Sequence, residues 1–209
     1  MQFIGETLLL AWGLIVSFDP VVYSIVILSL KVSFFSLFIS CAVAVPLGVA
    51  LGVYRFFGRN FLILVSNTLM GLPPVVVGLS VYLILSRSGP FGWMNFLYTP
   101  YAMIMAQFIL ILPIVTSLTC QKIEELRDEY KELFASLSVG KFHQFIIYLI
   151  DSRYALLTIF LAGFGRAISE VGAIIIVGRN IDHVTRMMTT AIAMHTSQGA
   201  LTLAMSLGL

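Results

Sequence analysis

Long apolar runs constrain the fold of this chain more than any other feature, because an α-helix needs about 20 apolar residues to cross a bilayer. The strongest runs cover residues 32–54, 61–85, 101–120 and 154–178, and a fifth begins after residue 189. Only helices and closed barrels satisfy their backbone inside a membrane, and these runs lack the alternation of barrel strands. The sequence therefore predicts an all-α polytopic membrane bundle of about five transmembrane helices.

Composition agrees with a membrane protein. Of the 209 residues, 59% are hydrophobic and only 11% are charged, whereas soluble domains carry about 25% charged residues. The net charge of +2 is too small to indicate a nucleic-acid-binding protein. Cys41 and Cys120 both lie in apolar runs, where we interpret them as buried hydrophobic residues rather than as a disulfide or a metal site.

The two ends of the chain differ from the central runs. Residues 3–17 are apolar but short, so they are predicted to form an interfacial helix, and Asp19-Pro20 is predicted to break the chain after it. We expect no removable signal peptide, because no cationic start precedes the first apolar run. The last run stops at Leu209, so the final helix is expected to be incomplete. Residues 1–209 are expected to form a single transmembrane domain.

Basic residues are distributed unequally between the segments that join the predicted spans. Segments 55–60 and 121–153 together hold seven Lys and Arg residues, whereas segments 86–100 and 179–188 hold three. Because cytoplasmic loops of membrane proteins are enriched in Lys and Arg, the first two segments are predicted to be cytoplasmic. The N-terminus is then predicted to lie outside.

The segment 121–153 is the longest polar part of the chain. It is predicted to form a charged helix, a break at 138–140 and a second, amphipathic helix. Gly140 suits a helix C-cap, because glycine adopts a positive φ without steric cost. The segment can be an ordinary connecting hairpin, or it can dock apolar side chains in a groove of a partner. These apolar residues are Leu133, Leu137, Phe142 and Phe145.

The same segment resembles the EAA loop of ABC importer permeases, in which Glu-Ala-Ala is followed by three residues and Gly. In that family the loop sits in a cleft of the cytoplasmic ATPase and transmits its opening and closing. Glu132 lies two positions before the glutamate of this motif. The resemblance implies that coupling to the ATPase involves Phe134, Ala135, Ser136, Gly140 and Lys141.

Other stretches follow the order seen in oxyanion importer permeases, and the resemblance extends over nearly the whole chain from Ser17. Within that group the chain is most similar to tungstate permeases, and molybdate permeases share fewer of these residues. The resemblance implies a multi-pass protein of a prokaryotic inner membrane. The stretches are "LSLKVS" (28–33), "GLPPVVVGLSVYLILSRSGPFG" (71–92), "GFGRAISEVGA" (163–173), "GRNIDHVTRMMTTAIA" (178–193) and "TSQGALTLAMSLGL" (196–209).

The resemblance also implies partners and an activity. The partners are a second copy of the chain in a homodimer, a cytoplasmic ABC ATPase dimer, an extracytoplasmic oxyanion-binding protein and the membrane lipid. The implied activity is import of a tetrahedral oxyanion by alternating access, with tungstate as the preferred candidate. The alternatives are a molybdate or sulfate ABC permease, or an autonomous anion channel or secondary carrier.

No catalytic set is recognised in the sequence. His143, His183 and His195 fall in segments without a metal-ligand spacing, so no metal site is predicted. The P-loop pattern G-x-x-x-x-G-K-[ST] does not occur, so the chain is not expected to hydrolyse ATP itself. We predict a transport subunit without a cofactor of its own, with ATP bound by a partner subunit.

Arg166 and Glu170 lie inside the fourth apolar run, where each unpaired charge costs about 2.5–3.5 kcal/mol. A spacing of four residues places both side chains on one helix face, where they can form an ion pair. The pair can be a static salt bridge or can help to set the inward- or outward-facing state; alternatively, Arg166 binds substrate directly. Gly163, Gly165 and Gly172 leave room for a neighbouring helix to approach.

Two further patterns concern helix packing. Pro73 and Pro74 remove two backbone donors, so the second run is predicted to kink or break there, either as a simple kink or to line the transport pathway. Gly48 and Gly52 form a GxxxG spacing that suits close packing of two helices.

Polar residues gather after the fourth run, at its predicted outer mouth. Arginine forks and hydroxyl donors complement an oxyanion that carries two negative charges. The same residues can instead pair with acidic groups of an extracytoplasmic binding protein, the interpretation that we favour. They are Arg179, Asn180, Thr185, Arg186, Thr189 and Thr190.

Overall fold

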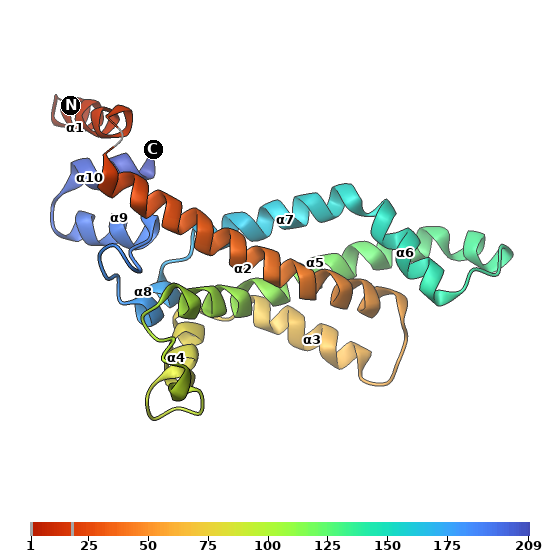
Figure 1. Cartoon of the computed structure of the whole chain (residues 1–209). Coiled ribbons are helices and arrows are strands. Elements are labelled where there is room, and N and C mark those ends of the chain that lie inside the picture. Colours follow the sequence, from red (N-terminus) through yellow and green to blue (C-terminus); the bar gives the residue numbers. More distant parts are fainter. Residues whose placement is uncertain (1, 18) are drawn as a thin grey trace. The chain divides into compact units, whose positions relative to one another are not determined.

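The computed structural model describes residues 2–17 and 19–209. Within these ranges every regular element is a helix (Figure 1), which confirms the all-α prediction. The elements are α1 (Gln2–Val16), α2 (Pro20–Val53), α3 (Arg59–Met70), α4 (Pro74–Leu85), the 3-10 helix η1 (Gly92–Met94), α5 (Pro100–Ser136), α6 (Lys141–Asp151), α7 (Arg153–Ile168), α8 (Gly172–Gly178), α9 (Met188–Ser197) and α10 (Leu201–Gly208).

Two helices, α2 and α5, are each long and apolar enough to cross a membrane. Two interrupted pairs, α3 with α4 and α6 with α7, have the length and composition of one further span each, so the described residues contain up to four spans. The helix predicted over 3–17 is present as α1, and its interfacial position stays a prediction. The span predicted after residue 189 is divided between α9 and α10, which Gly199 separates with a φ of 76°.

The Asp19-Pro20 pair starts the first long helix. The Asp19 carboxylate accepts hydrogen bonds from the amides of Val21 (2.9 Å) and Val22 (3.3 Å), as an N-cap does. Pro20 occupies the first helical position, where its missing amide proton costs nothing. The first span therefore belongs to a helix that begins at Pro20 rather than at residue 32.

The second predicted span, 61–85, is interrupted in the structure. Helix α3 ends at Met70 and α4 begins at Pro74. Because a proline disfavours helical backbone in the residue before it, Pro74 restricts Pro73 and Pro73 restricts the residue before it. The kink or break predicted at the two prolines is therefore a break between α3 and α4.

The described chain forms two compact units. We call the unit of residues 36–73 and 108–167 the hairpin unit, and the unit of residues up to 35, 74–107 and 168–209 the mouth unit. Two of the unit boundaries fall within α2 and α5, so each of these long helices contributes residues to both units.

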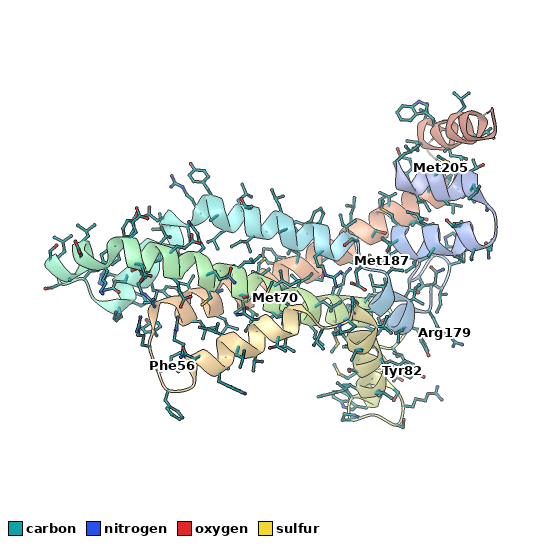
Figure 2. The ribbon with its side chains drawn as sticks, turned by 180° about the vertical axis from the view of Figure 1, so that it is seen from behind. Phe56, Met70, Tyr82, Arg179, Met187 and Met205 are labelled. Atoms are coloured by element: carbon teal, nitrogen blue, oxygen red, sulfur yellow. The ribbon has the colours of Figure 1, made fainter. Side chains whose placement is uncertain are left out.

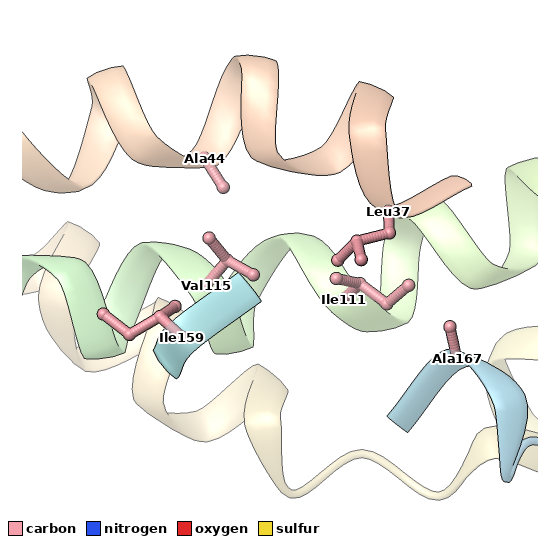
Figure 3. Packing of buried hydrophobic residues seen from close by; sticks show 6 residues of the cluster. All are labelled: Leu37, Ala44, Ile111, Val115, Ile159 and Ala167. Carbon is pink, nitrogen blue, oxygen red and sulfur yellow. The ribbon is translucent and has the colours of Figure 1, made fainter. Parts of the chain in front are cut away.

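Helices α2, α5 and α7 form the core of the hairpin unit (Figure 3). The GxxxG spacing brings α2 close to α5, as predicted: a Cβ on Gly48 would lie 2.6 Å from Cβ of Thr119. A Cβ on Gly52 would lie 2.6 Å from Cβ of Ile123, so neither glycine accepts a larger residue without displacement of α5. The core residues are Leu37, Ala44, Ile111, Val115, Ile159 and Ala167.

Side chains of α2 are arranged as in a membrane helix. Ser29, Ser36 and Ser40 are buried, whereas Phe34 and Phe38 are 51% and 60% exposed. A soluble protein usually buries such aromatic side chains and exposes serines. The reversed arrangement is typical of a membrane helix, in which polar side chains face the protein and apolar side chains face outward.

In the mouth unit, α4 and α8 pack with their backbones in direct contact. A Cβ on Gly78 would lie 2.7 Å from Cα of Ala173, so this crossing requires glycine at position 78. At the start of α8, a Cβ on Gly172 would lie 3.0 Å from Cγ2 of Val75. A small core elsewhere in this unit joins α2, α9 and α10 through Val22, Ile25, Ala191 and Leu207.

Candidate functional site

The loop that resembles a coupling loop is a helical hairpin, in which α5 ends at Ser136 and α6 begins at Lys141. The positive φ of the turn belongs to Ser138, at 50°. Gly140 has a φ of −65° and a ψ of 151°, which is extended backbone, and it is the N-cap of α6. The predicted C-cap role of Gly140 is therefore wrong.

Two hydrogen bonds close the end of α5 in a Schellman motif. The amide of Val139 donates to the carbonyl of Phe134 (3.1 Å), and the amide of Ser138 donates to the carbonyl of Ala135 (3.4 Å). This motif needs a left-handed residue directly after the helix, most often glycine. Ser138 occupies that position, so the turn lies two residues before the position of Gly140.

Apolar residues of the hairpin divide into a buried and an exposed set. Phe134 is 7% exposed, and its ring packs edge-on against Tyr130 and Tyr148, at centroid distances of 5.6 and 5.4 Å. Ala135, Ser136 and Lys141 are exposed. The apolar side chains next to the turn are exposed: Leu133 is 52%, Leu137 66% and Phe142 67% exposed. Phe134 therefore holds the hairpin together, while the last three residues are available to a partner.

Two arginines, one on α3 and one on α5, bind the C-terminal end of α2, which has no basic residue in its own last turn. Nε of Arg59 donates to the carbonyl of Leu51 (2.6 Å), and Nη1 of Arg127 donates to the carbonyl of Gly52 (2.8 Å). Arg59 also forms an ion pair with Glu124 of α5. Because cations stabilise the C-terminal carbonyls of a helix, these contacts fix the end of α2 on α5.

Away from the turn, a polar contact joins the two helices of the hairpin, α5 and α6. The Tyr130 hydroxyl donates to Oδ2 of Asp151 at 2.6 Å. Tyr130 also stacks on Tyr148, with an interplanar angle of 8°. The contacts of the arginines and of this tyrosine join residues that are distant in sequence, and no local pattern in the sequence identifies them.

Arg166 and Glu170 do not share a helix face, because α7 ends at Ile168 and α8 begins at Gly172. Arg166 lies in the last turn of α7, where a cation is favourable. Glu170 is 2% exposed, and its Oε1 accepts a hydrogen bond from the amide of Ala173 (3.0 Å) in the first turn of α8. The prediction of one continuous helix over 154–178 is wrong. That Arg166 and Glu170 form an ion pair or help to set the inward- or outward-facing state stays a prediction.

The glycines of this region differ in their surroundings. A Cβ on Gly163 would lie 2.8 Å from Cδ1 of Leu37, so α7 approaches α2 closely within the hairpin unit. No atom lies within 4 Å of a Cβ placed on Gly165 among the residues that the structure describes. Close approach of other residues is thus confirmed at Gly163 and at Gly172, whereas the prediction for Gly165 stays untested because no described residue lies near it.

Pro73 is exposed and Pro74 is partly buried as the first residue of α4. The helix that follows this break packs on α8, which follows the break at 169–171. The predicted spans 61–85 and 154–178 thus each supply one short helix, α4 and α8, to the mouth unit. That Pro73 and Pro74 line a transport pathway stays a prediction.

Most of the residues predicted at the outer mouth stabilise their own loop. Thr185 is fully buried; its hydroxyl donates to the carbonyl of Gly178 (2.5 Å) and accepts from the amide of Ile181 (2.9 Å). Thr190 is also buried and donates to Oδ1 of Asn180 (2.9 Å). These hydroxyls are engaged within the protein, which leaves little capacity for an anion.

Two other hydrogen-bonding groups of the predicted mouth are engaged as well. The Thr189 hydroxyl donates to the backbone carbonyl of Glu170 (2.8 Å). Arg186 pairs with Asp182, with 2.9 Å between Nη1 and Oδ1. Of the six predicted residues, Arg179 has the most accessible charge.

Arg179 lies beside two tyrosines that the sequence interpretation did not single out. Its guanidinium carbon is 5.1 Å from the ring centroid of Tyr98, and the Tyr98 ring is 6.5 Å from that of Tyr82. Figure 2 shows Arg179 and Tyr82 on adjoining parts of the mouth unit. Burial, followed by the hydrogen bond with Tyr82, raises the pKa of Tyr98, so its phenol stays protonated near neutral pH. Arg179 is exposed and the two tyrosines are partly buried, so the three side chains form a cationic and aromatic surface that is partly accessible.

Sequence comparison identifies the family to which this helical membrane protein belongs. The family "Binding-protein-dependent transport system inner membrane component" matches residues 44–209, and the chain belongs to it. It is therefore a multi-pass inner-membrane protein of a binding-protein-dependent transport system.

Individual relatives match over much of the chain. The tungstate uptake system permease protein TupB of Peptoclostridium acidaminophilum is 42% identical over 209 residues, all of this chain and 92% of that protein. A probable anion ABC transporter permease protein of Haloferax volcanii is 39% identical over 192 residues, 88% of this chain and 82% of that protein. TupB of Campylobacter jejuni is 36% identical over 146 residues, 70% of this chain and 61% of that protein.

Proposed function

We propose that this chain is the permease subunit of an ABC importer that moves a tetrahedral oxyanion, most specifically tungstate, into the cytoplasm by alternating access. The observation that carries the proposal is the 42% identity to a tungstate permease along the whole chain. A second tungstate permease and an anion permease support the same class of substrate.

Two copies of the chain form one pathway along their interface. Helix α3 supports this arrangement, because none of its residues, all of which lie in the described range, is buried. Asn67 and Thr68 are exposed on it, and Asn67 accepts a hydrogen bond from the Ser117 hydroxyl of α5. Polar side chains inside a membrane span face protein or water rather than lipid, so a second copy or the pathway covers this face.

Two cytoplasmic ATPase subunits bind and hydrolyse ATP, and the hairpin transmits their movement. The exposed residues Leu133, Leu137 and Phe142 enter a groove of the ATPase. The left-handed turn at Ser138 gives a second register for the coupling motif: with Ser138 at the glycine position, Glu132 occupies the position of the motif glutamate. This register removes the mismatch of two residues.

The hairpin lies in the cytoplasm and the N-terminus lies outside, as the distribution of basic residues predicts. An extracytoplasmic binding protein delivers the anion to the surface of Arg179, Tyr98 and Tyr82. An arginine presented on an aromatic ring suits recognition of acidic side chains on such a partner.

Reconstitution in proteoliposomes tests this function. The permease, its ATPase and its binding protein are expected to accumulate tungstate only when ATP is present, and an excess of tungstate is expected to reduce uptake more than the same excess of molybdate or sulfate. The permease alone is expected to transport nothing. Transport by the permease alone, without ATP, would instead identify an autonomous channel or carrier, and preferential competition by sulfate would reassign the substrate.

A further inference from the structure

The hairpin unit contains a cavity of about 540 Å³ that adjoins the coupling segment, with Ala135 and Lys141 in its lining. Its walls come from the end of α5, the turn, the start of α6 and the segment that follows α2. Phe134 and Tyr148, from the aromatic cluster described above, form its apolar side. The cavity is therefore built on a packed part of the unit.

The polar lining of this cavity has an excess of positive charge. Four cationic side chains line it, and Asp128 is the one carboxylate among its lining residues. Asp128 lies 3.6 Å from Nη2 of Arg127, which is itself committed to the carbonyl of Gly52. The remaining cations, Arg55, Lys131 and Lys141, form no ion pair with any side chain that the structure describes.

Other cations of the same unit are engaged differently. Arg59 pairs with Glu124, and Lys122 pairs with Glu125 at 2.8 Å. Arg153 lies over the ring of Tyr154, with 4.9 Å between its guanidinium carbon and the centroid. The unpaired cations of the unit are thus concentrated around one concave space, where their mutual repulsion favours the binding of an anion.

Neutral donors add to the positive charge of the cavity. Lys141 is the first residue of α6. The first turn of a helix has backbone amides without intrahelical partners and carries the positive end of the helix dipole, so this helix end adds positive potential beside the cavity. Ser138 also lines the cavity with a hydroxyl. Several donors from different elements suit a ligand with several acceptor oxygens on one centre, as in a phosphate group.

Aromatic residues lie directly beside this cavity. A second hollow, of about 350 Å³, shares Arg55 and is lined by Phe56, Phe57 and Phe61. All three phenylalanines are exposed (Phe56 is labelled in Figure 2). An arginine between a cationic cavity and exposed aromatic rings fits the boundary between phospholipid headgroups and acyl chains.

We propose that the cavity lined by Arg55, Lys131 and Lys141 binds a phosphate group, carried by an anionic phospholipid or by a soluble phosphate compound. The bound group joins the segment after α2 to both sides of the coupling turn. The site is independent of the anion that the protein transports, so failure of one proposal leaves the other standing.

Ligand-induced stabilisation tests the site in the full chain, reconstituted in phosphatidylcholine nanodiscs with its ATPase. Phosphatidylglycerol and inorganic pyrophosphate are titrated separately, and the unfolding temperature is followed. Stabilisation by phosphatidylglycerol alone identifies a lipid site, and stabilisation by pyrophosphate identifies a soluble ligand; either supports the proposal. Loss of two charged donors, in Arg55→Gln with Lys131→Gln, is expected to weaken the apparent affinity about tenfold or more.

The control is Lys122→Gln with Arg153→Gln, which removes the same charge from the same unit outside the cavity. It is expected to retain the affinity of the unmodified protein, and both double variants are expected to unfold normally without ligand because the altered side chains are at the surface. Equal weakening by both double variants would overturn the proposal. So would the absence of stabilisation by both probes, or a change confined to attachment of the ATPase.

Discussion

The hairpin unit and the mouth unit use their polar and apolar residues in opposite ways. In the hairpin unit, polar contacts join helices that are distant in sequence, as Arg127 joins α5 to the end of α2. Apolar residues of this unit, such as Leu137, are left exposed. In the mouth loop, polar residues such as Thr185 are buried in local hydrogen bonds. A polar cluster in the sequence can therefore be a scaffold, whereas exposed leucines can form the contact surface.

Substitution of Arg59 is expected to have the largest effect on stability. Arg59→Met leaves Glu124 and the carbonyl of Leu51 without their partner, in a place where Arg59 is only 12% exposed. The expected loss in free energy of unfolding is about 2–4 kcal/mol, measured by denaturation of the purified permease. Lys122→Met removes an exposed pair instead and is expected to cost about 0.5 kcal/mol; equal losses would show that the base of the hairpin does not depend on Arg59.

Substitution of Leu137 is expected to separate coupling from stability. Leu137→Asp places a charge on a side chain that is 66% exposed, so the unfolding midpoint of the permease is expected to stay unchanged. In the assembled importer, the charge is desolvated in the ATPase groove, and substrate-stimulated ATPase activity is expected to fall about tenfold or more.

The matched variant for this test is Leu137→Met, which keeps an apolar side chain and is expected to retain coupling. Normal stimulation of the ATPase by the Leu137→Asp protein would place the contact surface elsewhere on the hairpin.

Substitution of Thr185 tests the scaffold role of the mouth loop. Thr185→Val keeps the shape but removes the donor to Gly178 and the acceptor for the amide of Ile181. The expected cost is about 1–3 kcal/mol in the free energy of unfolding, with little change in the concentration of anion that gives half-maximal uptake. Thr196→Val, at an exposed position of α9, is the control. A weaker apparent affinity for anion without loss of stability would show that Thr185 contacts the substrate.

Substitution of Arg179 is expected to have the smallest effect. Arg179→Gln removes an exposed charge, so the stability is expected to change by less than about 0.5 kcal/mol. Association with the binding protein is expected to slow by a few-fold at low salt, with a smaller difference at high salt. Binding kinetics on immobilised permease measure the association rate. The rate for Arg179→Lys, which keeps the charge, is expected to lie between those of Arg179→Gln and the unmodified protein. Equal kinetics for the three proteins would exclude Arg179 from the contact.

Local patterns predicted the features that depend on local chemistry. The apolar runs indicated membrane helices, and the spacing of Gly48 and Gly52 indicated the close contact between α2 and α5. The hairpin between α5 and α6 followed from the change in polarity near residue 140. The left-handed turn was assigned to Gly140 because glycine has the stronger preference, although Ser138 adopts it in the structure.

Features that depend on tertiary contacts were not predictable in this way. Glu170 accepts a hydrogen bond in the first turn of α8, but its surroundings in the sequence are as apolar as those of a continuous span. The roles of Arg59 and Arg127 depend on carbonyls that other parts of the chain bring within reach. For the mouth threonines, the donors are evident in the sequence but their partners are not, so the sequence does not distinguish a scaffold from an anion site.

The glycine at position 78 has a mechanical consequence. With 2.7 Å between its missing Cβ and the backbone of Ala173, no side chain separates α4 from α8 at their crossing. Surfaces matched this closely cannot slide past one another in small steps, since any offset forces backbone atoms together. A transport cycle that displaces one of these short helices therefore carries the other with it, as a single rigid body.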